Sequence, residues 1–284
     1  AEIEQALLEG QLALYYQPKI NMRTGEFFGV EALIRWIHPE KGLIPPLEFL
    51  PTIEGTPLEI QVGEWVISSA IAQMKIWNSI DLDLEVSVNI SSHHLQSPNF
   101  IKFISNKLAE NSDINPEKLQ LEILESSVLG DLAVISDTLR ACQETLGVNI
   151  ALDDFGTGYS SLTHMRNLPT NTIKIDQSFV RDVLDDPSDY VIVNGVIGLA
   201  ESFERKVIAE GVESTEHGLI LLMMGCELAQ GYEIAKPLPA NDIYKWSTNQ
   251  VANEKWLKWG REKHTELQSK IALFELTCSW WKNH

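Results

Sequence analysis

The sequence is short of cysteine and of basic residues, and each shortage argues against a class of protein. Its 284 residues include three cysteines, which lie far apart at Cys142, Cys226 and Cys278. This spacing matches neither a zinc motif nor a disulfide framework, so we expect a reducing compartment, the cytoplasm. Lysine and arginine number 22 against 40 aspartates and glutamates, which makes the formal net charge -18. We therefore expect no nucleic-acid polymer as a partner, because duplex binding requires a basic face.

Long apolar runs and a signal peptide are also missing from the sequence. No run reaches the roughly 18 residues of a membrane helix, so we expect no membrane span in this chain. The sequence starts and stops abruptly. We therefore expect a piece of a longer protein, located in the cytoplasm or forming the cytoplasmic part of a membrane-anchored protein. Its 44% of hydrophobic residues suits one large globular domain, with or without an appendage.

Strands and helices alternate along most of the chain. A short helix at 3–8 precedes two strands at 12–19 and 26–36, which a turn joins into a predicted hairpin. Further strands are predicted at 84–90, 119–124, 148–153, 172–176, 206–210 and 228–230. Helices are predicted at 58–80, 99–110, 132–146, 160–166, 188–203 and 214–224. This alternation indicates a parallel α/β fold, and about eight strands favour a closed TIM-type barrel.

An open doubly wound sheet is the alternative to a barrel. No Gly-x-Gly-x-x-Gly turn follows the first strand, which weakens the dinucleotide-binding form of that fold. After the last strand the rhythm changes, and apolar residues such as Trp256, Trp259 and Ile271 recur at helical spacing. We therefore expect a barrel over residues 1–248 and a helical extension over 249–284. The extension would pack on the barrel or on a partner and lead to a further region of a longer protein.

Two adjacent carboxylates mark the centre of the sequence. Asp153 and Asp154 follow an apolar strand and precede a turn with Gly156 and Gly158. Adjacent acids at a strand tip repel each other, and burial strengthens that repulsion. A divalent cation would offset both charges. For this stretch alone, an exposed turn that leads into a helix is an equally good interpretation.

Polar residues also stand at the carboxyl ends of the other predicted strands, where barrel enzymes carry their active sites. They are Glu31, Arg35, Asn89, Glu122, Asp153, Asp154, Lys174, Glu210 and Gln230. Glu31 and Glu122 each lie between apolar neighbours, and a buried carboxylate is costly unless it is paired or ligated. Five acids and one amide at one barrel mouth are all oxygen ligands, which favours Mg²⁺ or Mn²⁺ over zinc.

Seven short motifs occur in order along the chain. They are EALIRW at 31–36, SVNIS at 87–91, EILES at 122–126, DDFGTGYSSL at 153–162, IKID at 173–176, AEGVE at 209–213 and QGY at 230–232. Through these motifs the chain resembles the EAL domain family, the cyclic di-GMP phosphodiesterases of bacterial signalling, over about residues 1–246. The resemblance implies a modified TIM (β/α)8 barrel with an antiparallel first strand. It also implies metal-dependent hydrolysis of cyclic di-GMP to linear pGpG.

The resemblance assigns roles to particular residues. The implied ligands of two Mg²⁺ or Mn²⁺ ions, with Asp153 shared, are Glu31, Asn89, Glu122, Asp153, Asp154 and Glu210. The implied catalytic residues are Glu31, Glu125, Asp154, Lys174 and Glu210. Among these, Lys174 would position or activate the attacking water, and Glu125 would hold the loop after the aspartate pair. The implied substrate-binding residues are Arg35, which would contact phosphate, and Leu33, Asp176, Gln230 and Pro237.

The resemblance also implies partners and leaves an alternative open. A homodimer is expected, with sensor or GGDEF-type domains in the full-length protein, and Ca²⁺ is expected to inhibit. The alternative function is a catalytically silent receptor that binds cyclic di-GMP. The chain keeps every acid of the motifs, which favours the enzyme. It departs from the family at Leu124, where Thr is common. It also departs in the stretch after Gln230, which has Glu233 and Ile234 where the family usually begins with an apolar or aromatic residue.

Overall fold

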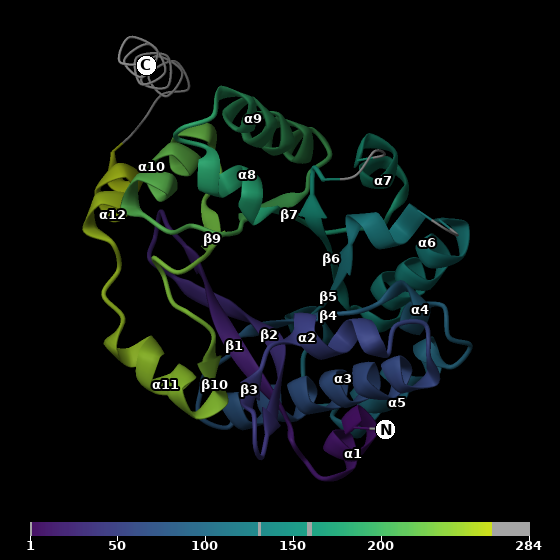
Figure 1. Ribbon diagram of the computed structural model, residues 1–284. Helices are drawn as coiled ribbons and strands as arrows, with labels where there is room; N and C mark the ends of the chain where they lie inside the picture. Colours follow the sequence, from purple (N-terminus) through teal and green to yellow (C-terminus); the bar gives the residue numbers. More distant parts are fainter. Residues whose placement is uncertain (1, 130–131, 158–160, 263–284) are drawn as a thin grey trace.

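In the computed structural model, which describes residues 2–129, 132–157 and 161–262, a closed barrel forms the centre of the molecule (Figure 1). Among these residues eight strands close the barrel: β1 Leu12–Asn21, β2 Phe27–His38, β4 Glu85–Asn89, β5 Leu119–Leu124, β6 Asn149–Phe155, β7 Thr172–Ile175, β8 Lys206–Ala209 and β9 Leu228–Gln230. Strand β1 is antiparallel to both of its barrel neighbours, β2 and β9, whereas neighbours from β2 round to β9 pair in parallel. The expected barrel with an antiparallel first strand is thus confirmed.

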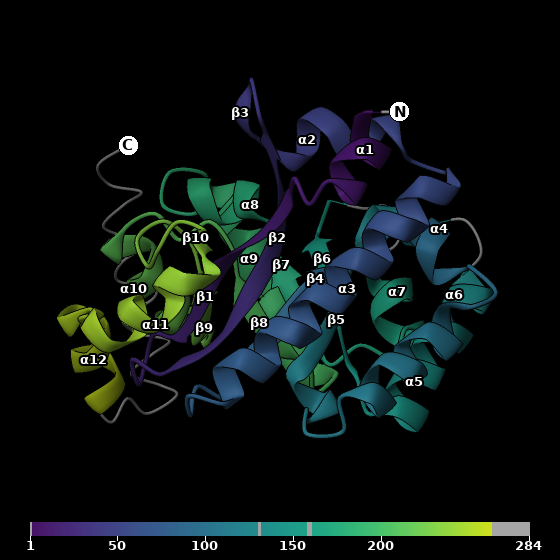
Figure 2. The ribbon, with the colours of Figure 1, turned by 90° about the horizontal axis from the view of Figure 1, so that it is seen from below.

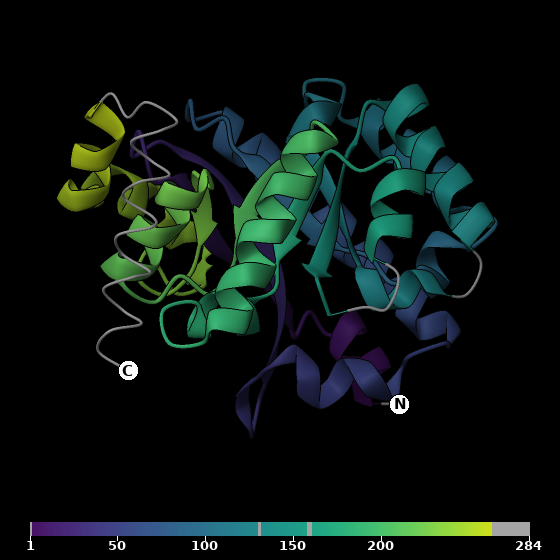
Figure 3. The same cartoon turned by 90° about the horizontal axis from the view of Figure 1, so that it is seen from above.

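Helices cover the outside of the barrel (Figure 1). They include α1 Glu2–Leu8, α3 Pro57–Asn78, α5 Phe100–Glu110, α6 Leu132–Arg140, α7 Ser161–Asn167, α9 Pro187–Ser202 and α10 Thr215–Met224. The two longest, α3 and α9, lie against opposite sides of the barrel (Figures 2 and 3). The helix predicted over 132–146 is α6 followed by a π-helical turn at Ala141–Thr145.

Several short elements were not predicted. They are β3 Gly42–Ile44, α2 Pro46–Phe49, α4 Ser92–Leu95, α8 Gln177–Asp182, β10 Leu238–Pro239 and α11 Ala240–Asn249. Strand β3 was not predicted because three residues are too few to show a period. It pairs with the end of β2, where Ile37 faces Leu43, and this hairpin projects beyond the barrel (Figure 2).

The strands bury both of their faces, and the alternation of side chains separates two environments. On β4, Val86 and Val88 are fully buried and alternate with Ser87 and Asn89, whose side chains form hydrogen bonds with Gln120 and Glu31 on the adjacent strands β5 and β2. The apolar face therefore packs under the helices, and the polar face points inward. This alternation is what places the chemistry of the chain inside the barrel.

The start of the expected C-terminal extension packs against the barrel's own helices. Helix α12, Glu254–Arg261, is capped by Asn253 and buries Trp256, whose Nε1 donates to the Thr215 carbonyl at 2.8 Å. Gly218 on α10 makes room for this ring, since a Cβ there would lie 2.3 Å from it. The later apolar residues of the extension lie outside the described residues, and the boundary at 248 stays a prediction. No described helix is both long and apolar enough to cross a membrane.

Candidate metal and substrate site

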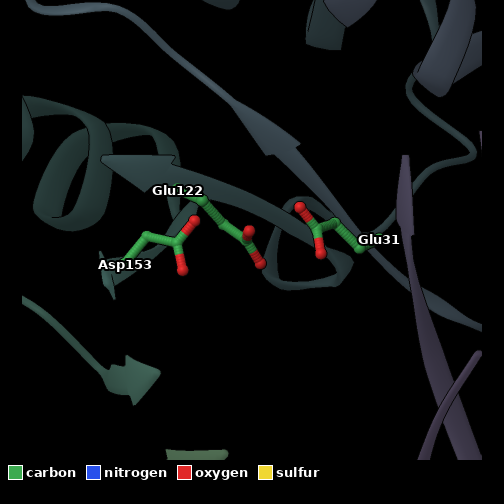
Figure 4. Close-up of side chains that lie close together, drawn as sticks. All are labelled: Glu31, Glu122 and Asp153. Atoms are coloured by element: carbon green, nitrogen blue, oxygen red, sulfur yellow. The ribbon is translucent and has the colours of Figure 1, made fainter. Parts of the chain in front are cut away.

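Carboxylates from three strands and one loop meet at the carboxyl ends of the barrel strands. Glu31 on β2, Glu122 on β5 and Asp153 on β6 point toward one another (Figure 4). Each offers an oxygen within 4.8 Å of an oxygen of the other two, and the same holds for a second group of Asp153, Asp154 and Glu210. Asp153 belongs to both groups. The structure therefore forms two adjoining acidic sites that share one residue, as the two-cation expectation requires.

Lys174 on β7 lies between these two groups. Its Nζ is 2.6 Å from Glu122 Oε2, 2.7 Å from Glu210 Oε1 and 3.0 Å from Asp153 Oδ1. A fourth carboxylate, that of Glu31, lies at 3.5 Å. Burial opposes the charge of this fully buried ammonium, but the four carboxylates outweigh it and raise the pKa of Lys174.

Burial is the largest influence on the pKa values of the acids in the site. It raises the pKa of Glu122 to about 7, against the opposing charge of Lys174. It also raises the pKa of Asp154 to about 7, and the neighbouring Asp153 adds to that rise. Burial likewise raises the pKa of Asp153 and of Glu210. The exception is Glu31, whose pKa is lowered because Lys174 and hydrogen bonds outweigh the effect of burial.

Amide side chains orient Glu31. Asn89 Nδ2 donates to Glu31 Oε1 at 2.8 Å, and Gln230 Nε2 donates to Glu31 Oε2 at 2.6 Å. Gln230 also donates to Gln17 Oε1 at 2.9 Å. Gln17 was not expected in the site. The β1–β2 hairpin pairs Gln17 with Glu31, but its register shifts by one residue between Lys19 and Ile20, so counting outward from the turn would have missed this pairing.

The loop after the aspartate pair is held by Glu125. The Gly156 N–H donates to Glu125 Oε2 at 3.0 Å, and Glu125 is fully buried. Asp154 adopts a φ of 53°, in the left-handed region, and its N–H donates to Asp153 Oδ1 at 3.1 Å. Asp176 is the N-cap of α8, where it accepts from the Ser178 N–H at 2.8 Å, and it contributes to the raised pKa of Asp154.

A polar cavity of about 410 Å³ adjoins the acidic groups. It is lined by Gln17, Glu31, Leu33, Arg35, Gln177, Glu210, Gly211, Glu213, Gln230, Gly231, Tyr232 and Pro237. Four of the expected substrate-binding residues, Leu33, Arg35, Gln230 and Pro237, thus share one cavity with two of the expected metal ligands. The Arg35 guanidinium lies 5.9 Å from the Tyr15 ring, and burial lowers its pKa.

A second, mostly apolar cavity of about 320 Å³ lies on the other side of Leu33. Its lining includes Asn89, which was expected to be a metal ligand, and also Leu124, which is 40% exposed. The departure from the family at position 124 therefore contributes an apolar side chain to a cavity wall. Glu233, another of the departures, accepts a hydrogen bond from Thr215 Oγ1 at 2.9 Å, at the start of α10.

The donor set fits Mg²⁺ or Mn²⁺. Every candidate ligand offers oxygen, which these hard cations prefer. Among the described residues, Glu122 Oε1 is buried and has no hydrogen-bond partner. An unpaired buried carboxylate oxygen is costly, and a bound cation would satisfy it. The first group with Asn89, and the second group with the shared Asp153, could each hold one ion.

Comparisons with known proteins agree with this geometry. Residues 1–237 match the EAL domain family. A cyclic di-GMP phosphodiesterase of Pseudomonas aeruginosa is 40% identical over 233 residues, which cover 82% of this chain and 39% of that protein. MucR of the same organism, a bifunctional diguanylate cyclase/cyclic di-GMP phosphodiesterase, is 39% identical over 246 residues, which cover 85% of this chain and 35% of MucR. The chain thus spans well under half the length of these relatives.

Solved structures show the same fold. The PaMucR phosphodiesterase in its c-di-GMP complex superposes with a TM-score of 0.80 at 38% identity, covering 85% of this chain and 98% of that one. The FimX EAL domain from Pseudomonas aeruginosa bound to c-di-GMP superposes with a TM-score of 0.75 at 27% identity, covering 83% and 94%. Sequence match, relatives and fold agree with the acidic barrel mouth. The chain belongs to the EAL domain family.

Proposed function

We propose that this chain hydrolyses cyclic di-GMP to linear pGpG with two divalent cations, Mg²⁺ or Mn²⁺. The observation that carries the proposal is the pair of acidic groups that share Asp153 beside the cavity containing Arg35. The names of the relatives support the substrate. Glu31, Asn89, Glu122 and Asp153 would hold one ion, and Asp154 and Glu210 would hold the second together with Asp153.

When bound, the cations would activate a water and offset charge on the attacking and leaving oxygens of the phosphodiester. The side chains of the chain do the rest. Asn89 and Gln230 hold Glu31 in one orientation, and Lys174 holds the carboxylates of both groups around one point. Its ammonium can also donate to the attacking water. The water adds to phosphorus and one P–O bond breaks, which leaves a 5′-phosphate and a 3′-hydroxyl.

Arg35 would bind the substrate phosphate through charge-assisted hydrogen bonds. The two cavities on either side of Leu33 differ in polarity, and together they would hold the two halves of the dinucleotide. Glu125 would position Asp153 and Asp154 through the Gly156 N–H, and Asp176 would position Asp154 from the start of α8.

The test is a product assay with matched binding measurements. The chain is incubated with cyclic di-GMP in Mg²⁺, in Mn²⁺ and in EDTA, and pGpG is quantified by chromatography. We expect product with either cation and none in EDTA. Asp153→Asn should lower the rate more than about 10³-fold. The matched control is Asp185→Asn, which changes an exposed aspartate after α8 and should retain activity. Binding of cyclic di-GMP without product in Mg²⁺ or Mn²⁺ would identify a receptor instead.

The assembly is also a proposal. We infer a homodimer in the cytoplasm, attached to sensor or GGDEF-type domains in a longer protein. The share of the relatives that this chain covers, and the cyclase activity in the name of MucR, support further domains. Light scattering after gel filtration measures the oligomer, and a monomer at all concentrations would contradict the dimer.

A further inference from the structure

A hydrogen-bonded series of polar side chains crosses the barrel interior beneath the acidic groups. Lys19 on β1 is fully buried, and its Nζ donates to Glu85 Oε1 at 2.8 Å and to Ser87 Oγ at 2.6 Å. Ser87 Oγ donates to Gln120 Oε1 at 2.7 Å, and Gln120 Nε2 donates to Thr172 Oγ1 at 3.2 Å. The series therefore joins β1, β4, β5 and β7 from one wall of the barrel to the other.

The composition of this series is unusual for its place. Barrel interiors are filled mainly by branched apolar side chains, and a buried ammonium is unfavourable unless it is paired. Lys19 can only donate, so the Ser87 hydroxyl accepts from Lys19 and donates its own hydrogen to the side-chain oxygen of Gln120. From Lys19 through Ser87 and Gln120 to Thr172, each group therefore donates to the next one. A Cβ at Gly29 would lie 3.2 Å from Lys19 Cε and 2.7 Å from the Glu85 carbonyl oxygen. Glycine there makes room for the lysine.

The series is in register with the site above it. Side chains two positions apart on a strand point to the same face of the sheet. Three members of the series each precede a site residue by two positions on one strand: Ser87 with Asn89, Gln120 with Glu122, and Thr172 with Lys174. Each bond of the series therefore restrains the strand segment directly below a site residue.

We propose that Lys19, Ser87, Gln120 and Thr172 are positioning residues for the metal site. Their bonds hold β4, β5 and β7 at one offset, so that the side chains above them meet a cation without rearranging. Substitution of the groups that orient metal ligands typically lowers metal affinity or activity about 10- to 100-fold. The inference rests on the proposed function only in taking Asn89 and Glu122 as ligands.

The test compares two substitutions at the far end of the series. Thr172→Val keeps the shape and removes the hydroxyl that accepts from Gln120, whereas Thr172→Ser keeps the hydroxyl. Calorimetric titration with Mg²⁺ in the absence of substrate should show binding about tenfold weaker for Thr172→Val and within about twofold of the parent for Thr172→Ser. With cyclic di-GMP, kcat should fall in Thr172→Val while KM stays near the parent value.

Ser87→Ala interrupts the series at a second point and should weaken Mg²⁺ binding similarly, so it decides the question if Thr172→Val does not fold. Parent-like Mg²⁺ affinity in the folded variants, even with a lower melting temperature, would overturn the proposal, since the series would then serve stability alone. A parent chain that binds Mg²⁺ but forms no pGpG would refute the proposed function and leave this inference standing if the variants still bind more weakly.

Discussion

At the scale of single residues, the site is organised around one buried side chain, the ammonium of Lys174. Lys174 contacts acids of both groups, so it balances part of their charge before any metal binds. Arg35 lies apart from these acids, in the wall of the polar cavity, where we propose that it binds phosphate. Lys174 and Arg35 should therefore affect different steps of turnover.

Substitutions of Arg35 and of Lys174 should separate substrate binding from the chemical step. Arg35→Ala should raise KM about 10- to 100-fold, because hydrogen bonds to charged groups contribute about 1.5–3 kcal/mol. Lys174→Ala should mainly lower kcat. Arg23→Ala is the matched control, since Arg23 pairs with Glu227 near the β1–β2 turn and should leave both constants unchanged. Steady-state kinetics measure both, and the reverse pattern would show that the roles are exchanged.

The pKa values of Glu122 and Asp154 predict how pH affects the metal-free protein. Both are raised to about 7 by burial, from usual values near 4. A carboxyl whose pKa is raised in the folded state binds its proton more tightly there than in the unfolded chain. Its contribution to the free energy of unfolding is therefore lost as pH rises through the raised pKa. In EDTA, the melting temperature should therefore fall between pH 5.5 and 8, and the stabilisation by Mg²⁺ should grow over the same window.

Glu122→Gln provides the control for this pH effect. The variant keeps the shape of the side chain and removes one of the groups that titrates, so its melting temperature in EDTA should depend less on pH. Scanning calorimetry at several pH values measures the difference. A parent melting temperature that rises from pH 5.5 to 8 in EDTA would contradict the assignment.

At the scale of elements, one buried glutamate links the end of β5 to the turn after β6. Glu125 follows β5 directly and accepts from the Gly156 N–H. Glu125→Ala should loosen Asp153 and Asp154 without removing a ligand, so activity should fall and half-saturation should need more Mg²⁺. Glu117→Ala removes an exposed glutamate before β5 and serves as control. A Mg²⁺ titration of Glu125→Ala that overlays the parent curve would refute this role.

Helix α12 offers a second prediction at this scale, concerned with stability. Trp256 is 2% exposed and fills the space over Gly218 on α10. Trp256→Ala should lower the free energy of unfolding by about 3–5 kcal/mol, as truncation of buried aromatic side chains does. Lys258→Ala, on the exposed part of the same helix, should change it little. Urea denaturation measures both, and equal stability of the two variants would mean that α12 contributes little to the fold.

At the scale of the whole molecule, the closed barrel sets the spacing between the two acidic groups. Their members come from β2, β5, β6 and the loop after β8, so they cannot move independently. Mg²⁺ takes six oxygens at about 2.0–2.1 Å, whereas Ca²⁺ prefers six to eight at about 2.3–2.6 Å. Ca²⁺ should therefore support binding of cyclic di-GMP but little or no hydrolysis. One calorimetric titration and one product assay with Ca²⁺ as the sole divalent ion decide this, and turnover comparable to that in Mg²⁺ would contradict it.

The sequence by itself determined the barrel and most of the acidic site. Glu31 and Glu122 are conspicuous because each is an acid among apolar neighbours, and the alternation of strands and helices predicts that strand ends meet at one mouth. These are local signals, so one strand at a time is enough to find them. The expectation that Asp153 is shared came from the resemblance to the EAL domain family, since no single strand indicates it.

Only the tertiary structure decided the parts that depend on the register between distant strands. Gln17 and Lys19 look alike in the sequence as polar residues of an opening strand. Because β1 runs against its neighbours, the earlier residue, Gln17, lies at the acidic site and Lys19 lies below it. The packing of Trp256 on α10 likewise joins segments about forty positions apart. Such contacts follow from closing the barrel, and no window of sequence contains both partners.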